Sequence, residues 1–260
     1  MPTHTSGNPV AIPELAAARG KIGKVAAWDK FGYNTSVSNS AAEVIWEGGG
    51  ATYGGFLTSA GTVSVVSSSI NDDAAGPARA NAHKIIIEGL DSNWAVATEE
   101  ITLDGTGAVT GSTSFFRVYR AYVTDVGVYG NTNAGNITIS IGGTTVAIIG
   151  AGYGQTEMAI YTVPASKTLY LTQIDAFADT TSREFTVQLK QRLNADDSVA
   201  PVSGIRVMRV LTTSNPSPGT VLELNGAISF PAKTDIWVEA LADTSGSGLT
   251  VSLQGYLVDD

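Results

Sequence analysis

The chain has 260 residues, no cysteine and two histidines, and its formal net charge at pH 7 is −9. The absence of cysteine excludes disulfides, thiolate zinc ligands and thiol nucleophiles. The acidic balance disfavours contact with nucleic-acid phosphates or anionic lipid. From this composition we expect no nucleic-acid partner, no membrane partner, no metal and no cofactor.

Residues 1–40 are expected to form an extended N-terminal arm. Within it, residues 13–20 begin with proline and end with glycine, a pattern typical of a short helix, and two helical turns are unstable alone in water. Trp28, Phe31 and Tyr33 follow, and such aromatic side chains bury large areas when a segment orders. We expect these three residues to contact a partner subunit, with packing on their own domain as the alternative.

Residues 41–154 are expected to form a first β-sandwich domain. β-Branched runs bounded by glycine, asparagine and aspartate predict strands. The clearest runs are 43–46, 62–66, 83–87, 99–103, 137–141 and 144–149. Asp104-Gly105 and Gly142-Gly143 suit hairpin turns that require positive φ.

The run 115–123 places an aromatic side chain and an arginine on each of its two faces. Such a strand is expected to be covered on both sides, inside a sandwich or in a subunit contact. Its aromatic residues complete the set of candidate partner contacts: Phe115, Phe116, Tyr119 and Tyr122.

Residues 155–260 are expected to form a second β-sandwich of the jelly-roll kind. The predicted strands are 158–163, 169–177, 185–189, 205–211, 221–230, 236–241 and 249–256. Strands at this spacing without helical interruption favour an all-β antiparallel sandwich over a parallel βαβ sheet. One large sandwich, in place of two domains that meet near Gly154, is the alternative.

No arrangement of residues in the sequence specifies a reaction. His4 and His83 lie far apart, and no Gly-x-Ser-x-Gly elbow presents a nucleophile. A glycosidase needs two carboxylates across a cleft, but Glu99 and Glu100 point to opposite faces of a regular strand. Three aspartate pairs are interpreted as solvated turn or terminal residues: Asp72-Asp73, Asp196-Asp197 and Asp259-Asp260. We expect a non-enzymatic protein without catalytic residues.

Three sequence blocks follow one another in the first predicted domain, at 85–94, 98–105 and 114–123. This ordered series resembles virion structural proteins of marine tailed bacteriophages, including cyanophages. In those proteins a strand that ends in a Gly-Leu-Asp turn precedes a threonine-rich strand, an Asn- or Asp-Gly hairpin and an aromatic Arg-Val strand. The likeness covers residues 44–149.

The resemblance implies a non-enzymatic structural protein located in the virion. We expect an oligomeric head decoration (cement) protein that binds the major capsid protein or tail subunits through its arm and sandwich faces. Charged residues make up only 15% of the chain, below the about 25% of typical soluble domains, and this indicates that partners cover part of the surface, as in a homo-oligomer. The alternative is a tail or fibre component that recognises host-surface glycans, with Trp94 and Tyr129 as candidate sugar contacts.

Overall fold

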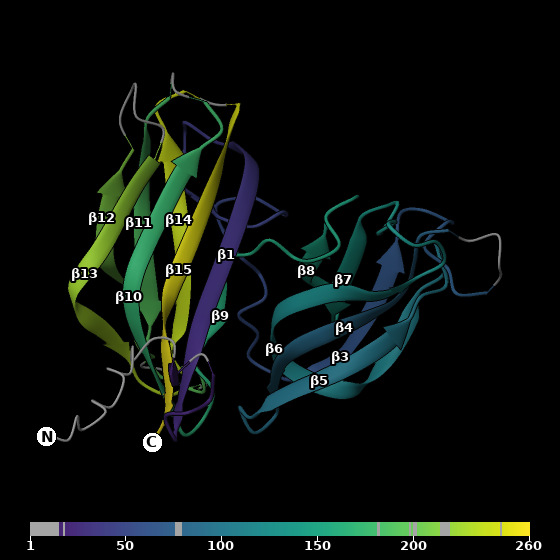
Figure 1. Ribbon diagram of the computed structural model, residues 1–260, viewed down its shortest axis with the longest axis horizontal. Helices are drawn as coiled ribbons and strands as arrows, with labels where there is room; N and C mark the ends of the chain where they lie inside the picture. Colours follow the sequence, from purple (N-terminus) through teal and green to yellow (C-terminus); the bar gives the residue numbers. More distant parts are fainter. Residues whose placement is uncertain are drawn as a thin grey trace, which may run out of the picture.

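The protein is all-β, and its strands form three antiparallel sheets. A computed structural model describes residues 16–17, 19–75, 80–180, 183–197, 199, 202–213, 219–244 and 246–260, with the backbone alone for Asn225. Two of the sheets face each other in a sandwich, and the third forms a separate unit beside it (Figure 1). The sequence-based prediction of an all-β sandwich fold is therefore confirmed.

The sandwich has the strand order of a jelly roll. One sheet is ordered β1 (Val25–Val37), β15 (Ser247–Asp259), β10 (Lys167–Ala178) and β13 (Gly219–Phe230). The other is ordered β12 (Arg206–Thr212), β11 (Phe185–Arg192), β14 (Asp235–Ala242) and β2 (Glu43–Val44), and β9 (Ile160–Thr162) also pairs with β14. With β2 and β9 counted as one interrupted strand, the first strand pairs with the last, the second with the seventh, the third with the sixth and the fourth with the fifth. This is the pairing of a long hairpin rolled into two layers.

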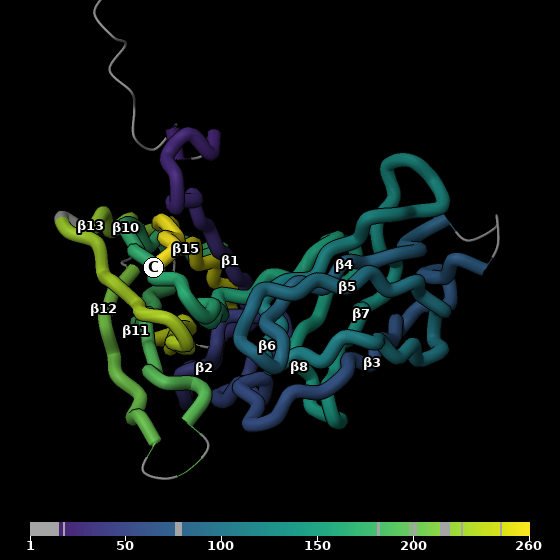
Figure 2. Tube along the Cα trace, turned by 90° about the horizontal axis from the view of Figure 1, so that it is seen from below, coloured from purple at the N-terminus to yellow at the C-terminus, as the bar shows by residue number. Residues whose placement is uncertain are grey.

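The chain between β2 and β9 forms the third sheet, called here the inserted domain. Its strand order is β5 (Val96–Thr102), β4 (Ala82–Asp91), β6 (Val109–Val126), β3 (Gly61–Ser67), β7 (Ile137–Ile141) and β8 (Thr144–Ile149). The 18-residue strand β6 pairs with β3 along its first half and with β4 along its second half. Seen from below, this domain projects to one side of the sandwich (Figure 2).

One of the two predicted hairpins is present. Gly142 and Gly143 have φ angles of 56° and 82° and join β7 to β8, where Ile141 pairs with Thr144. Gly105 also has positive φ, but β5 and β6 are not neighbours, because β4 lies between them. The predicted hairpin at Asp104-Gly105 is therefore wrong, and β5 forms its hairpin with the preceding strand, β4.

Residues 25–37, expected to be part of an arm, form strand β1. β1 pairs with β15 from Val25 opposite Val258 to Asn34 opposite Leu249. Gly32 lets β1 approach the rest of the chain closely, because a Cβ atom there would lie 2.2 Å from the amide nitrogen of Ala159. The expected boundary at residue 40 therefore falls inside the sandwich, between β1 and β2.

Half of the predicted helix at 13–20 lies outside the described residues. Its end is visible: the Lys21 N–H donates to the Ala16 carbonyl at 2.8 Å and the Gly20 N–H to the Ala17 carbonyl at 2.9 Å. Gly20 has a φ of 62°. These features form a Schellman motif, the common end of an α-helix at glycine.

The sandwich and the inserted domain have separate cores that meet across an apolar contact. The sandwich core is built from buried side chains of both its sheets, such as Phe185 and Phe230. The core of the inserted domain includes Val63 and Phe115, and it extends to Trp237 on β14 of the sandwich. The two units therefore bury apolar surface against each other.

Candidate interaction surfaces

Trp28 and Tyr119 are partly buried, and both pack against Tyr161. The Trp28 ring lies 5.0 Å from the Tyr161 ring, and the Tyr119 ring lies 5.1 Å from the same ring, centroid to centroid. Trp28 comes from β1, Tyr161 from β9 and Tyr119 from β6 of the inserted domain. This cluster thus joins the two units, which is the alternative that the sequence left open for Trp28.

The three other aromatic residues of the run 115–123 contact their own domain. Phe115 is 0% exposed in the core of the inserted domain, so its expected role as a partner contact is wrong. Phe116 stacks on Trp94 with the centroids 4.7 Å apart and the planes at 14°. Tyr122 is partly buried, and its hydroxyl donates to Glu88 Oε1 at 3.4 Å. Burial of Phe115 in the core and the stacking of Phe116 on Trp94 agree with a strand covered on both sides.

Phe31 and Tyr33 remain at the surface. Both are partly exposed and line a shallow groove with Tyr153, Glu157 and other residues. The Tyr33 hydroxyl donates to Asp179 Oδ2 at 2.6 Å, and this bond raises the pKa of Tyr33 well above its ordinary value. Their expected role as partner contacts stays a prediction.

A buried ion pair joins β6 of the inserted domain to the start of β14. Arg117 donates from Nε to Asp235 Oδ1 at 2.9 Å and from Nη2 to Oδ2 at 3.1 Å, and the two side chains are 3% and 0% exposed. Thr162 Oγ1 also donates to Asp235 at 2.6 Å, and Arg117 Nη1 donates to the carbonyls of Leu57 and Phe116. With its donors and acceptors satisfied, the pair is compatible with burial.

Sequence reasoning missed this pair. Arg117 and Asp235 are 118 positions apart, and each follows a run that reads as ordinary strand and turn. The one available signal was the arginine directly after two phenylalanines in a strand that was expected to be covered, because a buried arginine requires a buried acceptor.

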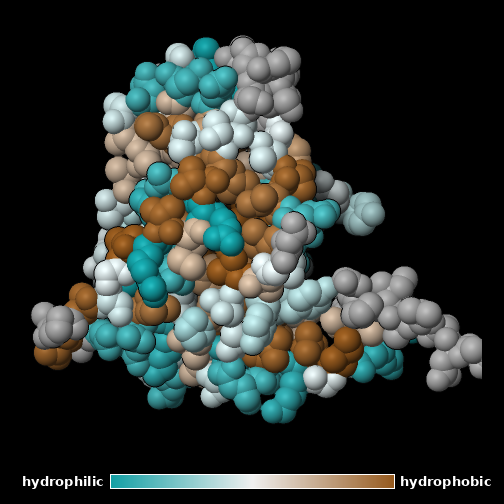
Figure 3. Space-filling view, turned by 90° about the vertical axis from the view of Figure 1, so that its left-hand side faces the viewer, coloured by the Kyte–Doolittle hydropathy of each residue, from teal (hydrophilic) through white to brown (hydrophobic). Residues whose placement is uncertain are grey.

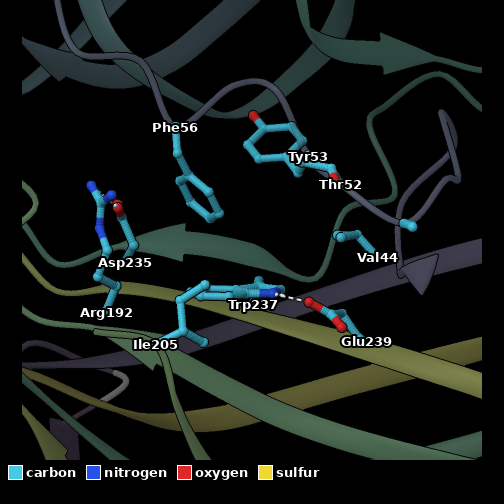
Figure 4. A pocket seen from close by; sticks show the side chains of 10 residues that line it. Val44, Thr52, Tyr53, Phe56, Arg192, Ile205, Asp235, Trp237 and Glu239 are labelled. Atoms are coloured by element: carbon cyan, nitrogen blue, oxygen red, sulfur yellow. Dashed lines mark hydrogen bonds and ion pairs between the residues drawn. The ribbon is translucent and has the colours of Figure 1, made fainter. Parts of the chain in front are cut away.

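A pocket of about 170 Å³ lies beside the ion pair, between β14 and the segment after β2 (Figure 4). Its walls are mainly aromatic and aliphatic: Val44, Tyr53, Phe56, Ile205 and Trp237. Its carboxylates already have partners. Glu239 accepts from the Trp237 indole at 2.7 Å and from Lys190 at 2.5 Å, and Asp235 is held by Arg117. The pocket is thus shaped for one apolar group and offers no unengaged acid or base.

Asp72, expected to be a solvated turn residue, is 0% exposed. Its carboxylate accepts from Ser67 Oγ at 2.6 Å and from the backbone N–H groups of Ala82, Ala134 and Gly135. It therefore organises the loop after β3 and is not available for chemistry. Of the other acidic pairs, Asp196 pairs with Lys233, and Asp259 pairs with Lys167.

Two ionisable side chains near the junction have strongly altered proton affinity. Burial, together with the nearby Glu157, raises the pKa of Glu47 to about 8. Burial lowers the pKa of Lys30 on β1 to about 7, with Arg120 acting in the same direction. The Lys30 ammonium donates to the backbone carbonyl of Tyr119 on β6. Both groups lie where the inserted domain joins the sandwich.

Within the described ranges, no three histidine, aspartate or glutamate side chains are grouped so as to hold a metal ion. The same residues contain no helix that is both long enough and apolar enough to cross a membrane.

No protein-family model matches this sequence, and no curated protein matches it. Weak similarity was found to solved structures of infectious bursal disease virus. The structure of the Gt strain is 9% identical over 90% of this chain and 72% of that chain, with a TM-score of 0.25. The Gx strain (7% identity, 91% and 77% covered) and a mutant VP2 protein in derived T=1 particles (8% identity, 91% and 74% covered) both have TM-scores of 0.19. TM-scores this low do not establish a common fold, and these likenesses carry no argument for function.

Proposed function

We propose that this chain is a non-enzymatic structural subunit of a virus particle. The observation that carries the proposal is a jelly roll whose inserted domain is fixed to it by the buried pair of Arg117 and Asp235. Jelly rolls occur in capsid proteins and lectins, and a fold alone does not decide function. The second support is the ordered series of blocks at 85–123, which resembles virion proteins of tailed bacteriophages.

In the finer form of the proposal, the chain is an oligomeric head decoration protein. It binds neighbouring particle subunits through Phe31 and Tyr33 and through the residues that precede β1. The net charge of −9 suits the outside of a head, away from packaged DNA.

The arm can be tested without damaging the sandwich. Deletion of residues 1–40 would remove β1 and leave β15 without its neighbour, so loss of assembly in that variant would not identify an arm. Deletion of residues 1–15 keeps β1 intact. We expect the shorter truncation to remain folded by circular dichroism and to be lost from gradient-purified particles. Incorporation at the normal copy number would refute the role of the arm.

Location in the virion has its own test. Quantitative mass spectrometry of gradient-purified particles is expected to find this chain at a fixed ratio to the major capsid protein, and immunogold labelling is expected to place it on heads. Absence from purified particles would refute the virion proposal, and labelling restricted to tails would refute the decoration role.

Recognition of host-surface glycans by a tail or fibre component is the second candidate. Tyr129 is fully exposed in a loop of the inserted domain, as a sugar-stacking residue must be. Trp94, the other expected sugar contact, is 5% exposed beneath Phe116, so that part of the expectation is wrong. A glycan array probed with the wild type and with Tyr129→Ala tests this candidate. Binding that depends on Tyr129 would favour it, and an array without binding would reject it.

A further inference from the structure

Strand β12 forms an edge of the sandwich with open backbone groups. Among the described strands it pairs with β11 alone. The Thr213 N–H donates to the Phe185 carbonyl, so in the alternating antiparallel pattern the N–H and C=O of Val210 point away from β11. The Thr212 carbonyl on the same outer side accepts a side-chain hydroxyl from the described residues, that of Thr220 at 3.0 Å. The outer side of β12 can therefore accept a further strand.

Apolar side chains are exposed along this edge. Ile205, Val207 and Val210 are 62%, 49% and 56% exposed, and Val221 on the neighbouring edge strand β13 is 54% exposed. In the view that faces this side of the sandwich, hydrophobic residues gather in the middle of the surface (Figure 3). Contiguous exposed apolar residues of this kind mark interaction sites more often than single ones do.

The edge is basic in an acidic protein. Arg206 and Arg209 are both exposed, and neither forms an ion pair within the described part of the chain. The full sequence carries a net charge of −9. Charged side chains on an edge strand oppose pairing with an identical edge. The same charges favour a strand that carries carboxylates opposite them. The two arginines therefore select against a second copy of β12 and in favour of an acidic segment.

The pocket described above adjoins the start of this edge. Ile205, which immediately precedes β12, lines the pocket together with Trp237 and Phe56. When an extended peptide adds to a sheet edge, backbone hydrogen bonds supply affinity, and pockets for individual side chains supply specificity. A segment lying on β12 can place one apolar side chain against Ile205, at the rim of this pocket.

We propose that β12 is a docking edge for an extended, acidic segment of a partner chain, which adds as a further strand and packs one apolar side chain against Ile205 at the rim of the Trp237 pocket. The segment is acidic because it meets Arg206 and Arg209, and it is rich in β-branched residues because it covers Val207 and Val210. This edge has no role in the proposed function, and the same docking is expected whether or not the partner is a virion protein.

Two labelled peptides test the charge preference. In one, glutamate and valine alternate and a leucine stands at one end; in the other, lysine replaces glutamate. Fluorescence anisotropy with the full chain is expected to show binding of the acidic peptide, weakened by salt, and binding of the basic peptide at least about tenfold weaker. Equal binding of the two peptides, or no binding of the acidic peptide, would overturn the proposal.

Two variants test the position of the site. Val210→Pro removes an outward N–H on an edge strand, where proline is tolerated. It is expected to weaken binding of the acidic peptide at least about tenfold, and Val210→Thr is its control.

Arg206→Glu is expected to weaken binding of the acidic peptide similarly, whereas Lys21→Glu, an equal charge change at an exposed lysine, is expected to have little effect. Equal losses in Arg206→Glu and Lys21→Glu would show non-specific electrostatics and contradict the proposal. Sedimentation velocity that shows a dimer abolished by Val210→Pro would assign the edge to a second copy and also contradict it.

Discussion

The guanidinium of Arg117 and the carboxylate of Asp235 depend on each other, because the two side chains are only 3% and 0% exposed. Removing one partner of a buried pair leaves an uncompensated charge and costs about 3–5 kcal/mol, whereas replacing both with apolar groups costs far less. The pair therefore stabilises the junction only while both members are present.

For this pair we predict that Asp235→Asn lowers the free energy of unfolding by about 3–5 kcal/mol. The double variant Arg117→Met/Asp235→Leu is expected to lose less than the single variant, as measured by urea denaturation. Glu100→Gln serves as the control, because it breaks an exposed ion pair with Lys84 and is expected to leave the midpoint nearly unchanged. Equal shifts for Asp235→Asn and Glu100→Gln would contradict this account of the junction.

Glu47 makes stability depend on pH. Its pKa is raised from 4.5 to about 8 in the folded protein, so between these values the folded state holds more protons than the unfolded state. Stability conferred by the protonated carboxyl is complete below the unfolded pKa and is lost as the pH rises towards 8. Lys30 has a pKa of about 7 in the folded protein. It adds little to the pH dependence of stability below pH 7, because it is mostly protonated there in both the folded and the unfolded state.

We therefore predict that the stability gained through Glu47→Gln increases as the pH rises from about 5 to 7. The group is partly exposed, and after allowance for solvent screening the slope is expected to stay below about 1 kcal/mol per pH unit. Denaturant midpoints of both proteins across this range provide the measurement. Parallel pH profiles for the two proteins would show that Glu47 is not the titrating group.

At the scale of elements, β1 shows why part of the fold could not be predicted from the sequence. Its buried face carries Lys30, Gly32 and Asn34, because that face meets the inserted domain and the connecting segments as well as the sandwich core. A strand whose inward positions are polar or glycine lacks the alternation on which strand prediction depends. By contrast, β7 and β11 have regular alternation and lie close to their predicted ranges.

The close approach of β1 gives a prediction at this scale. An alanine Cβ at position 32 would lie 2.2 Å from the Ala159 amide nitrogen and 2.7 Å from the Ile45 carbonyl oxygen, and backbone atoms cannot move aside cheaply. Gly32→Ala is expected to cost about 3 kcal/mol in thermal or urea unfolding. Gly23→Ala meets no atom within 4 Å and is expected to change stability by less than about 0.5 kcal/mol. Similar stabilities of the two variants would refute the close packing of β1.

At the scale of the whole molecule, the sequence predicted the fold class but not the connection between its parts. The chain begins the sandwich with β1 and β2, leaves it for the inserted domain and returns at β9, so the expected boundaries at residues 40 and 154 do not separate successive domains. Insertion into a strand leaves no compositional mark. The residues that join the parts, Arg117 and Asp235, come together only when the jelly roll has formed.

We propose that this two-part β unit is a building block of a particle. Electron cryomicroscopy of purified particles tests it most directly. We predict density that accepts the sandwich and the inserted domain in their present relative orientation, at symmetry-related positions in contact with neighbouring subunits. A particle map in which every protein density is accounted for by other chains would contradict the claim.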